Sequence, residues 1–345
     1  MLSRVADALY WMSRYVERAE NVARFISVNL NLLLDSPGTT DEQWMPLVVT
    51  TGDKLPFLNR YGEASRENVL HFLTFDKENP NSIISCFTAA RSNARSVRET
   101  ISAEMWEHIN RAYLLVQDSH LNPELEQLVE FHEHMRQSGQ HFIGVTDSTM
   151  THNEGWHFCQ LGRLLERADK TSRILDTKYF MLLPTPEAIG SSLDEVQWSA
   201  LLRSASAHQM YRQRHGRITP INVVEFLILD RQFPRAILYC LTKANESLHA
   251  VTGAALGGFT NQAEKLLGQI QAELAYKRAE DIIEDGLHEF VDNLQTRMNE
   301  VGESIYETFL SIQPIDDLQF QSKRRLNRFQ NIGVGNDVLS GCQSQ

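Results

Sequence analysis

The sequence contains a segment that occurs twice, and this internal repeat limits the possible folds more than any other feature. The segment RYVERAENVARFI, residues 14–26, is matched by RLLERADKTSRIL, residues 163–175, a shift of 149 positions (14 to 163). A second block, residues 69–90, matches residues 223–244 at a shift of 154 positions (69 to 223). Because both blocks recur in the same order, the sequence predicts two similar halves around a pseudo-two-fold axis.

Helical periodicity dominates along the chain, and strand patterns are scarce. A helix is predicted from Ser3 to about Leu34, and its counterpart from Thr151 or Asn153 to Leu183. The remaining predicted helices cover residues 69–75, 97–116, 123–143, 223–229 and 262–309, the last broken near Gly286, with Pro80 and Pro234 just inside the helices after the two short segments. The fold class is therefore all-α, a duplicated helical bundle.

The length of 345 residues is enough for a well-buried core. We predict a first repeat half at 1–149, a second at 150–312, and a loosely ordered C-terminal tail at 313–345. The net charge of −11 argues against a nucleic-acid or anionic-membrane binder, because such surfaces need a surplus of lysine and arginine. The basic segment from Lys323 to Arg328 is the local exception, and we expect it to be solvated.

The sequence gives no sign of a membrane span or a secretion signal. Its apolar runs are shorter than the roughly 20 residues that a span needs, and Asp7 interrupts the N-terminal stretch. We therefore expect the protein in the cytoplasm. Its four cysteines form no CxxC pair. Cys86 and Cys240 occupy equivalent repeat positions, where small buried apolar side chains are expected.

Charged residues form a stripe on one side of each long repeated helix. The two sets are Arg14, Glu17, Arg18, Asn21 and Arg24 in the first copy, and Arg163, Glu166, Arg167, Lys170 and Arg173 in the second. A solvent-exposed face tolerates any polar residue, yet the arginines and the glutamate recur while their apolar neighbours differ. Mutual pairing is the simplest explanation, with Glu17 against Arg167 and Glu166 against Arg18.

Three interpretations of this stripe remain open: a buried structural network, a ligand site, and a solvated face. In a ligand site, arginines would bind a carboxylate or phosphate, and Glu17 and Glu166 would be candidate acid–base residues. The candidate anion-binding residues are Arg14, Arg18, Arg24, Arg163, Arg167, Arg173 and Arg235. Asp230 and Arg231 could add to the same pocket.

Other chemistry has weaker support. The acid-x-x-His spacing of metal-binding bundles occurs at Glu154/His157, Glu246/His249 and Asp285/His288. These pairs do not fall at equivalent repeat positions, so we predict no metal site, and the sequence implies no cofactor. We expect His132, His134 and His141 to be exposed or to cap helix ends. No GxSxG motif marks a nucleophile.

Longer motifs connect the chain to a known family. They are LSRVADALYWMSRYVERAENVAR near the N-terminus, ARSNARSVRETISAEMWEHIN at 90–110, EGWHFCQLGRLLERADKTSRILD at 154–176 and FLILDRQFPRAILYCL at 226–241. With these motifs, which extend from Met1 to about Leu310, the chain resembles the Alpha-E family, bacterial all-helical domains named for a Glu-Arg motif. That motif corresponds to Glu17-Arg18 and Glu166-Arg167.

The resemblance implies a cellular context more than a chemistry. Alpha-E domains occur beside, or fused to, circularly permuted ATP-grasp ligase-like proteins and transglutaminase-like proteases, which implies a part in making, attaching or trimming a small peptide or amide. The leading hypothesis is an accessory partner of an ATP-grasp-type ligase, in which the Glu-Arg core aligns the halves or binds an anionic substrate. The alternatives are an enzyme that uses Glu17 and Glu166 with arginine anion clamps, and a metal-dependent bundle.

Overall fold

The computed structural model describes residues 1–35, 44–119, 125–180 and 192–311. Every regular element in these ranges is helical, which confirms the all-α prediction. All of these elements belong to one compact unit, Met1–Leu310. In chain order they are α1 (Ser3–Asp35), α2 (Met45–Thr51), α3 (Lys54–Tyr61), α4 (Arg66–Thr74), α5 (Ile83–Ser96), α6 (Ala103–Asp118), α7 (Leu125–Thr149), α8 (Glu154–Phe180), α9 (Ser192–Ser204), α10 (His208–Arg214), α11 (Pro220–Val224), the π-helical turn η3 (Glu225–Leu229), α12 (Ile237–Thr252), α13 (Gln262–Tyr276), α14 (Ala279–Glu284), α15 (Leu287–Ile305) and the π-helical turn η4 (Tyr306–Leu310).

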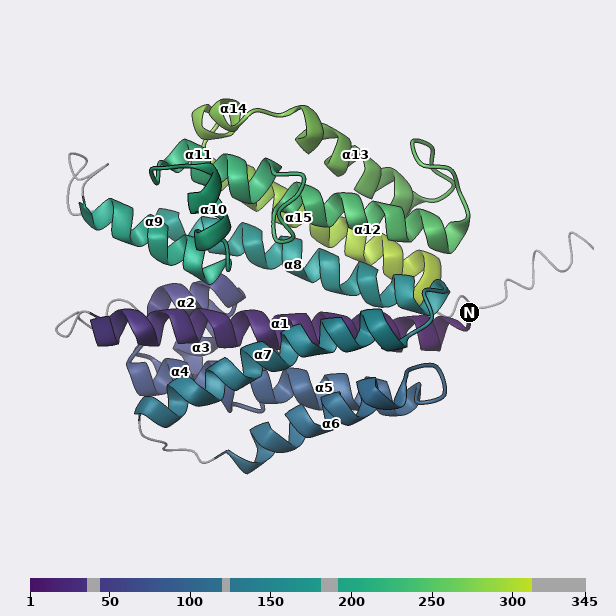
Figure 1. Ribbon diagram of the computed structural model, residues 1–345, viewed down its shortest axis with the longest axis horizontal. Coiled ribbons are helices and arrows are strands. Elements are labelled where there is room, and N and C mark those ends of the chain that lie inside the picture. The colour runs from purple at the N-terminus through teal and green to yellow at the C-terminus, as the bar shows by residue number, and fades with distance from the viewer. Residues whose placement is uncertain (36–43, 120–124, 181–191, 312–345) are drawn as a thin grey trace, which may run out of the picture. The chain divides into compact units, whose positions relative to one another are not determined.

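The long helices α1 and α8 lie side by side through the middle of this unit (Figure 1). They run in the same direction, because the Met1 amine lies 2.9 Å from Glu154 Oε2 at their first turns and Arg18 meets Glu166 further along. Helices α5 and α7 pack on α1, and α12 and α15 pack on α8. Side chains between α1 and α8 are therefore enclosed from both sides.

Two glycines allow close helix contacts. A Cβ atom added at Gly162 of α8 would overlap the backbone oxygen of Tyr10 in α1. A Cβ at Gly139 of α7 would overlap the side chain of Glu20. Only glycine fits at 162 without moving a helix backbone, so this residue sets the closeness of α1 and α8 at that level.

Two buried apolar clusters surround α1. The first part of the helix, including Leu9 and Met12, packs into a cluster with residues of α8, α12, α13 and α15. The second part, including Val22 and Ile26, packs with α2 to α7, around fully buried rings such as Phe87. Because α1 contributes large apolar side chains to both clusters, it belongs to both parts of the core. Burying each such side chain stabilises the fold by about 1.5–3 kcal/mol.

Several predicted helix limits are confirmed. Helix α1 ends one residue beyond the predicted Leu34. Helix α8 begins at Glu154, where Asn153 Oδ1 accepts a hydrogen bond from the Gly155 amide at 3.0 Å. The break at Gly286 is present, with φ of 95°. The predicted end at Leu183, the tail at 313–345 and the basic segment in it lie outside the described residues.

Other predicted limits are wrong. Pro80 and Pro234 lie three residues before α5 and α12 rather than inside them, because the chain turns after Asp76 and Asp230 before each helix begins. The helix predicted at 97–116 begins only at Ala103, since Ser102 accepts a hydrogen bond from the Met105 amide and caps it. The helix predicted at 123–143 continues to Thr149. The 262–309 segment has a second break, at 277–278.

Within the described ranges, no helix combines the length and the apolar character needed to cross a bilayer.

Candidate functional site

Two reciprocal Arg–Glu pairs connect α1 and α8. Arg167 donates from Nε and Nη2 to the two oxygens of Glu17, each at 2.8 Å. Arg18 donates from Nε and Nη2 to the two oxygens of Glu166, at 2.6 and 3.0 Å. These are the pairs predicted from the repeat. The planar guanidinium matches a carboxylate in both places, a geometry that lysine cannot reproduce.

Both glutamates are removed from solvent and remain charged. Glu17 is 2% exposed and Glu166 is 0% exposed. Burial alone would raise the pKa of Glu17, but the charges of Arg167 and Arg235 outweigh it and hold the pKa far below its usual range. For Glu166, Arg18 and Arg14 likewise outweigh burial and lower the pKa well below its ordinary value. Neither carboxylate is suited to taking up a proton near neutral pH.

Further cations complete the surroundings of Glu166. Arg14 Nε lies 2.8 Å from Glu166 Oε2, and Lys170 Nζ lies 3.6 Å from Oε1. Arg18 uses its remaining Nη1 to donate to Asn81 Oδ1 at 2.7 Å. One carboxylate is thus shared by three cations.

Glu17 is the centre of the second cluster. Arg235 Nη1 lies 3.2 Å from Glu17 Oε1, and its Nη2 lies 3.0 Å from Glu20 Oε2. Arg24 Nη1 lies 2.9 Å from the other oxygen of Glu20. Arg24 also donates to Asn21 and, at 2.6 Å, to the carbonyl of Ser204. Arg235, which lies just before α12, therefore links that helix to α1.

Two of the predicted residues lie apart from these glutamates. Arg173 Nε pairs with Asp169 Oδ2 at 2.9 Å, one turn earlier on α8. Arg163 donates to Gln160, and no carboxylate oxygen of the described residues lies within 4.0 Å of its guanidinium nitrogens. Burial lowers the pKa of Arg163 to about 10, and the like charge of Arg167 adds to the effect. Arg163 is therefore a desolvated cation without an ion-pair partner there.

Three members of the network, Glu20, Asp169 and Asn81, were not predicted from the sequence. Glu20 and Asp169 correspond at the same shift of 149 positions, and the acidic residue at this place could have been read from the aligned repeats. Asn81 and Arg235 correspond at the shift of 154, yet one binds Arg18 and the other binds Glu17. Because one half has an amide and the other a cation at this position, comparison of the two repeats does not mark the position as part of the network.

Among the residues predicted for the site and their acidic partners on α1 and α8, cations outnumber carboxylates. The cations are Arg14, Arg18, Arg24, Arg163, Arg167, Lys170, Arg173 and Arg235, against the carboxylates of Glu17, Glu20, Glu166 and Asp169. The whole chain has a net charge of −11. A local excess of cations in an acidic protein favours a negatively charged ligand at the edge of this region.

Comparison with known proteins finds a family that is itself described by a Glu-Arg motif. A family profile described as a predicted alpha-helical domain with a conserved ER motif, Alpha-E, matches residues 1–310. The chain belongs to the Alpha-E family.

Relatives of this Alpha-E chain are longer proteins. The uncharacterized proteins Mb2597 of Mycobacterium bovis and MT2643 and Rv2567 of two Mycobacterium tuberculosis strains are each 22% identical to it over 338 residues. The match covers 90% of this chain and 37% of each relative, so the chain spans little more than a third of their length. No solved structure matches the chain.

The acid-x-x-His pairs of this Alpha-E chain are engaged in other contacts. Glu154 binds the Met1 amine, and Glu246 binds Lys243 at 2.8 Å. His288 Nδ1 lies 2.5 Å from Asp176 Oδ1. The described part of the chain has no group of three or more His, Cys, Asp or Glu side chains that could hold a metal ion.

The expectation for His132 is wrong. Its ring is fully buried, with Nε2 3.0 Å from Thr74 Oγ1 and Nδ1 2.7 Å from the Leu128 carbonyl. Burial lowers the pKa of His132 to about 4. Cys86 and Cys240 are buried as expected, and burial raises the pKa of each thiol to about 12, which leaves neither one reactive.

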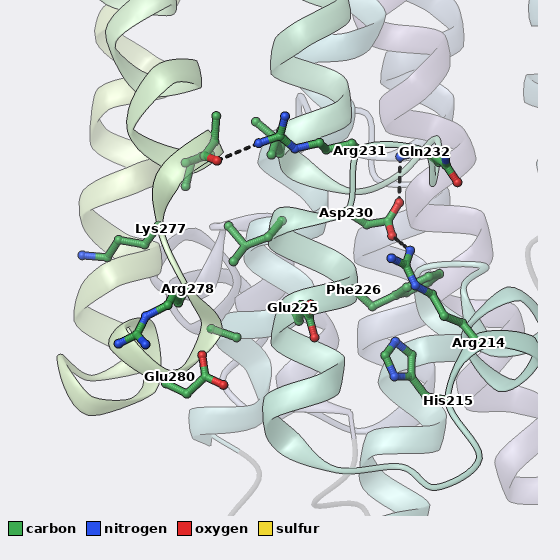
Figure 2. A pocket seen from close by; sticks show the side chains of 15 residues that line it. Arg214, His215, Glu225, Phe226, Asp230, Arg231, Gln232, Lys277, Arg278 and Glu280 are labelled. Atoms are coloured by element: carbon green, nitrogen blue, oxygen red, sulfur yellow. Dashed lines mark hydrogen bonds and ion pairs between the residues drawn. The ribbon is translucent and has the colours of Figure 1, made fainter.

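A cavity of about 480 Å³ has neither Arg235 nor any residue of the Glu-Arg core in its lining. Figure 2 shows Asp230 and Arg231 on one wall and Lys277, Arg278 and Glu280 across from them. Asp230 accepts from Arg214 and from the Gln232 amide, and Arg231 donates to the Ala275 carbonyl at 2.7 Å. The suggestion that Asp230 and Arg231 share a pocket with the core arginines is therefore wrong, because they line this separate cavity.

A second cavity, of about 310 Å³, does border the core. Arg163 and Arg167 of α8 line it, together with Asp147 at the end of α7 and Tyr239 of α12. Among the predicted anion-binding residues, these two arginines are the ones that reach this cavity.

Proposed function

We propose that this Alpha-E chain is an accessory protein of an ATP-grasp-type ligase system in peptide or amide synthesis or modification. In this proposal the Glu-Arg core aligns the two halves of the domain and does no chemistry. A circularly permuted ATP-grasp-like protein is the expected partner, and a transglutaminase-like protease is a further candidate. The observation that supports an accessory role best is the saturation of both core glutamates by arginine.

The geometry disfavours the alternative in which Glu17 and Glu166 act as acid and base. A general base works best with a pKa near the working pH and with access to the substrate. Both carboxylates are buried, each is held by a bidentate arginine, and the pKa of each lies far below neutrality. Their charges serve to neutralise the arginines beside them.

The duplicated architecture is part of the proposal, with halves at 1–149 and 150–312 and a tail at 313–345. Contacts that recur at the shift of 154 positions support it. Arg60 pairs with Asp76 as Arg214 pairs with Asp230. The thiols of Cys86 and Cys240 each approach the carbonyl of the proline six residues before, at 3.8 and 3.4 Å. Two copies facing one another would make the Glu-Arg pairs reciprocal.

The lengths of the relatives are compatible with a domain that acts beside others. Each of the three mycobacterial proteins contains further sequence outside the matched region. A fused partner would need such additional length. The acidic net charge supports a protein or small-molecule partner rather than nucleic acid. A cytoplasmic location is part of the same proposal.

The test is to isolate the chain from its native cells and identify what remains bound by mass spectrometry. The proposal expects an ATP-grasp-like protein in stoichiometric amount. Purified separately and recombined, the two should form a complex by light scattering, and the chain should change the partner's rate of ATP hydrolysis. The proposal would be contradicted if no ATP-grasp-like protein is isolated with the chain and if the chain leaves the rate of ATP hydrolysis of such a protein unchanged on mixing.

The Glu166→Gln variant is a matched control for the role of the core. Studied at a temperature at which the variant is still folded, it should bind the partner and change its ATP hydrolysis as the unaltered chain does. A folded variant that binds normally but has lost the effect would instead support the acid–base alternative.

A further inference from the structure

The cavity of about 310 Å³ between α7, α8 and α12 is lined by two opposite charges that have no ion-pair partner among the described residues. Arg163 lies on its α8 wall and Asp147 on its α7 wall. We propose that this cavity binds the zwitterion of a small α-amino acid or short peptide, with the ligand carboxylate on Arg163 and its ammonium group on Asp147. This site does not depend on the ATP-grasp partnership.

The contrast with the other copy of the repeat supports a ligand role for Arg163. Its counterpart Arg14 is saturated: it binds Glu166 Oε2 at 2.8 Å and Tyr10 Oη at 3.1 Å, and it lies 4.9 Å from the centre of the Trp11 ring. Among the described residues, the Arg163 guanidinium has only the amide oxygen of Gln160 as a hydrogen-bond acceptor. Both arginines are withdrawn from water, but only Arg14 receives a carboxylate in return.

We therefore expect the Arg163 guanidinium to bind an anion from outside the protein. A guanidinium in a partly desolvated site binds a carboxylate through two parallel hydrogen bonds, and such charge-assisted bonds are stronger than neutral ones. Glu17, the core carboxylate whose charge acts on Arg163, already uses both oxygens on Arg167 and forms no ion pair with Arg163 within 4.0 Å.

Asp147 supplies the complementary charge. Its side chain is exposed, and it has no ion pair within 4.0 Å among the described residues. It influences Arg163 electrostatically, yet the two do not form a salt bridge. Two opposite charges that line one cavity but form no salt bridge with each other can each bind one end of a ligand whose own charges are a few bonds apart. The other ionised pair of the lining, Lys243 and Glu246, is closed on itself at 2.8 Å.

The remaining walls suit the body of such a ligand. Tyr239 and Leu164 provide apolar surface, and Trp156 and His157 extend it along α8. Trp156 Nε1 and His157 Nδ1 are buried without a hydrogen-bond partner, so this wall has polar capacity that the protein does not use. A volume of about 310 Å³ lies at the small end of ligand pockets and fits one or two residues rather than a long peptide.

A phosphate ligand fits less well. A phosphate near neutral pH has between one and two negative charges and no positive group to place against Asp147, which would repel it. A zwitterion places its positive end beside this carboxylate. The charge pattern thus favours an amino acid, and phosphate becomes a comparison in the test.

The experiment is titration calorimetry of the full chain with single L-α-amino acids, glycine-containing dipeptides, their amides, their N-acetyl derivatives and inorganic phosphate. At least one free amino acid or dipeptide should bind with a Kd below about 10 mM. Its amide and its N-acetyl form should each bind at least about tenfold more weakly. Binding of none of the zwitterions, or tighter binding of phosphate, would overturn the proposal.

Variants locate the binding in this cavity. Arg163→Gln should weaken binding at least about tenfold without lowering Tm, because Arg163 has no ion pair to lose. Asp147→Asn changes an exposed side chain, so it gives a second folded variant and should weaken binding of the free amino acid but not of its N-acetyl form. Arg136→Gln, at a half-exposed pair with Glu133 outside the cavity, should bind normally. Unchanged affinity in both cavity variants would contradict the assignment.

Discussion

Arg18 of α1 binds both carboxylate oxygens of Glu166 in α8, at 2.6 and 3.0 Å. Glu17 and Arg167, the adjacent residues of the same two motifs, make the same contact in the opposite sense. Each Glu-Arg dipeptide thus gives one acceptor and one donor to the other helix. A shift of either helix along its axis would break both pairs together, so the two contacts fix the register of α1 against α8.

Removing the charge of Glu166 should destabilise the fold strongly. In Glu166→Gln, Arg14 and Arg18 would remain largely buried without their counter-charge, and the loss of one partner of a buried pair costs about 3–5 kcal/mol. Urea denaturation followed by circular dichroism measures this loss directly.

A matched variant separates this effect from the loss of any carboxylate. Glu133 makes a half-exposed pair with Arg136 within α7, so Glu133→Gln should change the free energy of unfolding by no more than about 0.5 kcal/mol. Equal losses in the two variants would contradict the view that burial gives the core pairs their importance.

Gly162 should tolerate no side chain. Gly162→Ala places a methyl group against the backbone oxygen of Tyr10, and such overpacking costs about 1–3 kcal/mol. Gly144 of α7 has open space around its Cβ position, and Gly144→Ala should stabilise the protein by about 0.5–1 kcal/mol through helix propensity. Thermal denaturation of both variants should give Tm changes of opposite sign, and a stable Gly162→Ala protein would show that α1 and α8 can move apart.

His132 should make the protein sensitive to mild acid. The pKa of its buried ring is lowered from 6.5 to about 4, so the neutral ring's contribution is fully present above pH 6.5 and is lost as the pH falls towards 4. The expected loss between pH 7.5 and 4.5 is roughly 2–3 kcal/mol in the free energy of unfolding. Glu17 and Glu166, whose folded pKa values are depressed, add their losses only below about pH 4.5.

His132→Gln isolates this contribution. The variant should be less stable than the unaltered protein at pH 7.5, because the contacts with Thr74 and Leu128 change, but it should lose less stability on acidification. Urea unfolding at pH 7.5 and 4.5 measures both quantities. Parallel losses in the two proteins would mean that the ring is not held neutral.

The repeat is why the sequence predicted so much of the core. The recurrence of Glu17-Arg18 as Glu166-Arg167 predicted the two long helices, the charged face of each and the partners in each ion pair. It could do so because each motif pairs with the other. The all-α class followed from helical periodicity, which burial of one side of each helix enforces. These inferences depend on local pattern and on the comparison of two copies.

The rest depends on contacts between distant segments. That Arg235 reaches Glu17 and Glu20, while Asn81 at the matching position reaches Arg18, follows from how α12 and α5 approach the central pair. The burial of His132 depends on Thr74, which is 58 residues away in sequence. That Arg163 has no ion-pair partner in the described part of the chain is visible only from the positions of the carboxylates around α8.

The most direct test of the core's role is a double-mutant cycle on Arg18→Met and Glu166→Gln, with free energies of unfolding from urea denaturation. Residues in direct contact in one network couple by about 0.5–3 kcal/mol, and a buried bidentate pair should lie in the upper part of that range. We predict a coupling above about 1 kcal/mol, and a similar value for the Glu17 and Arg167 cycle. Additive effects within about 0.5 kcal/mol would contradict the claim that these pairs hold α1 to α8.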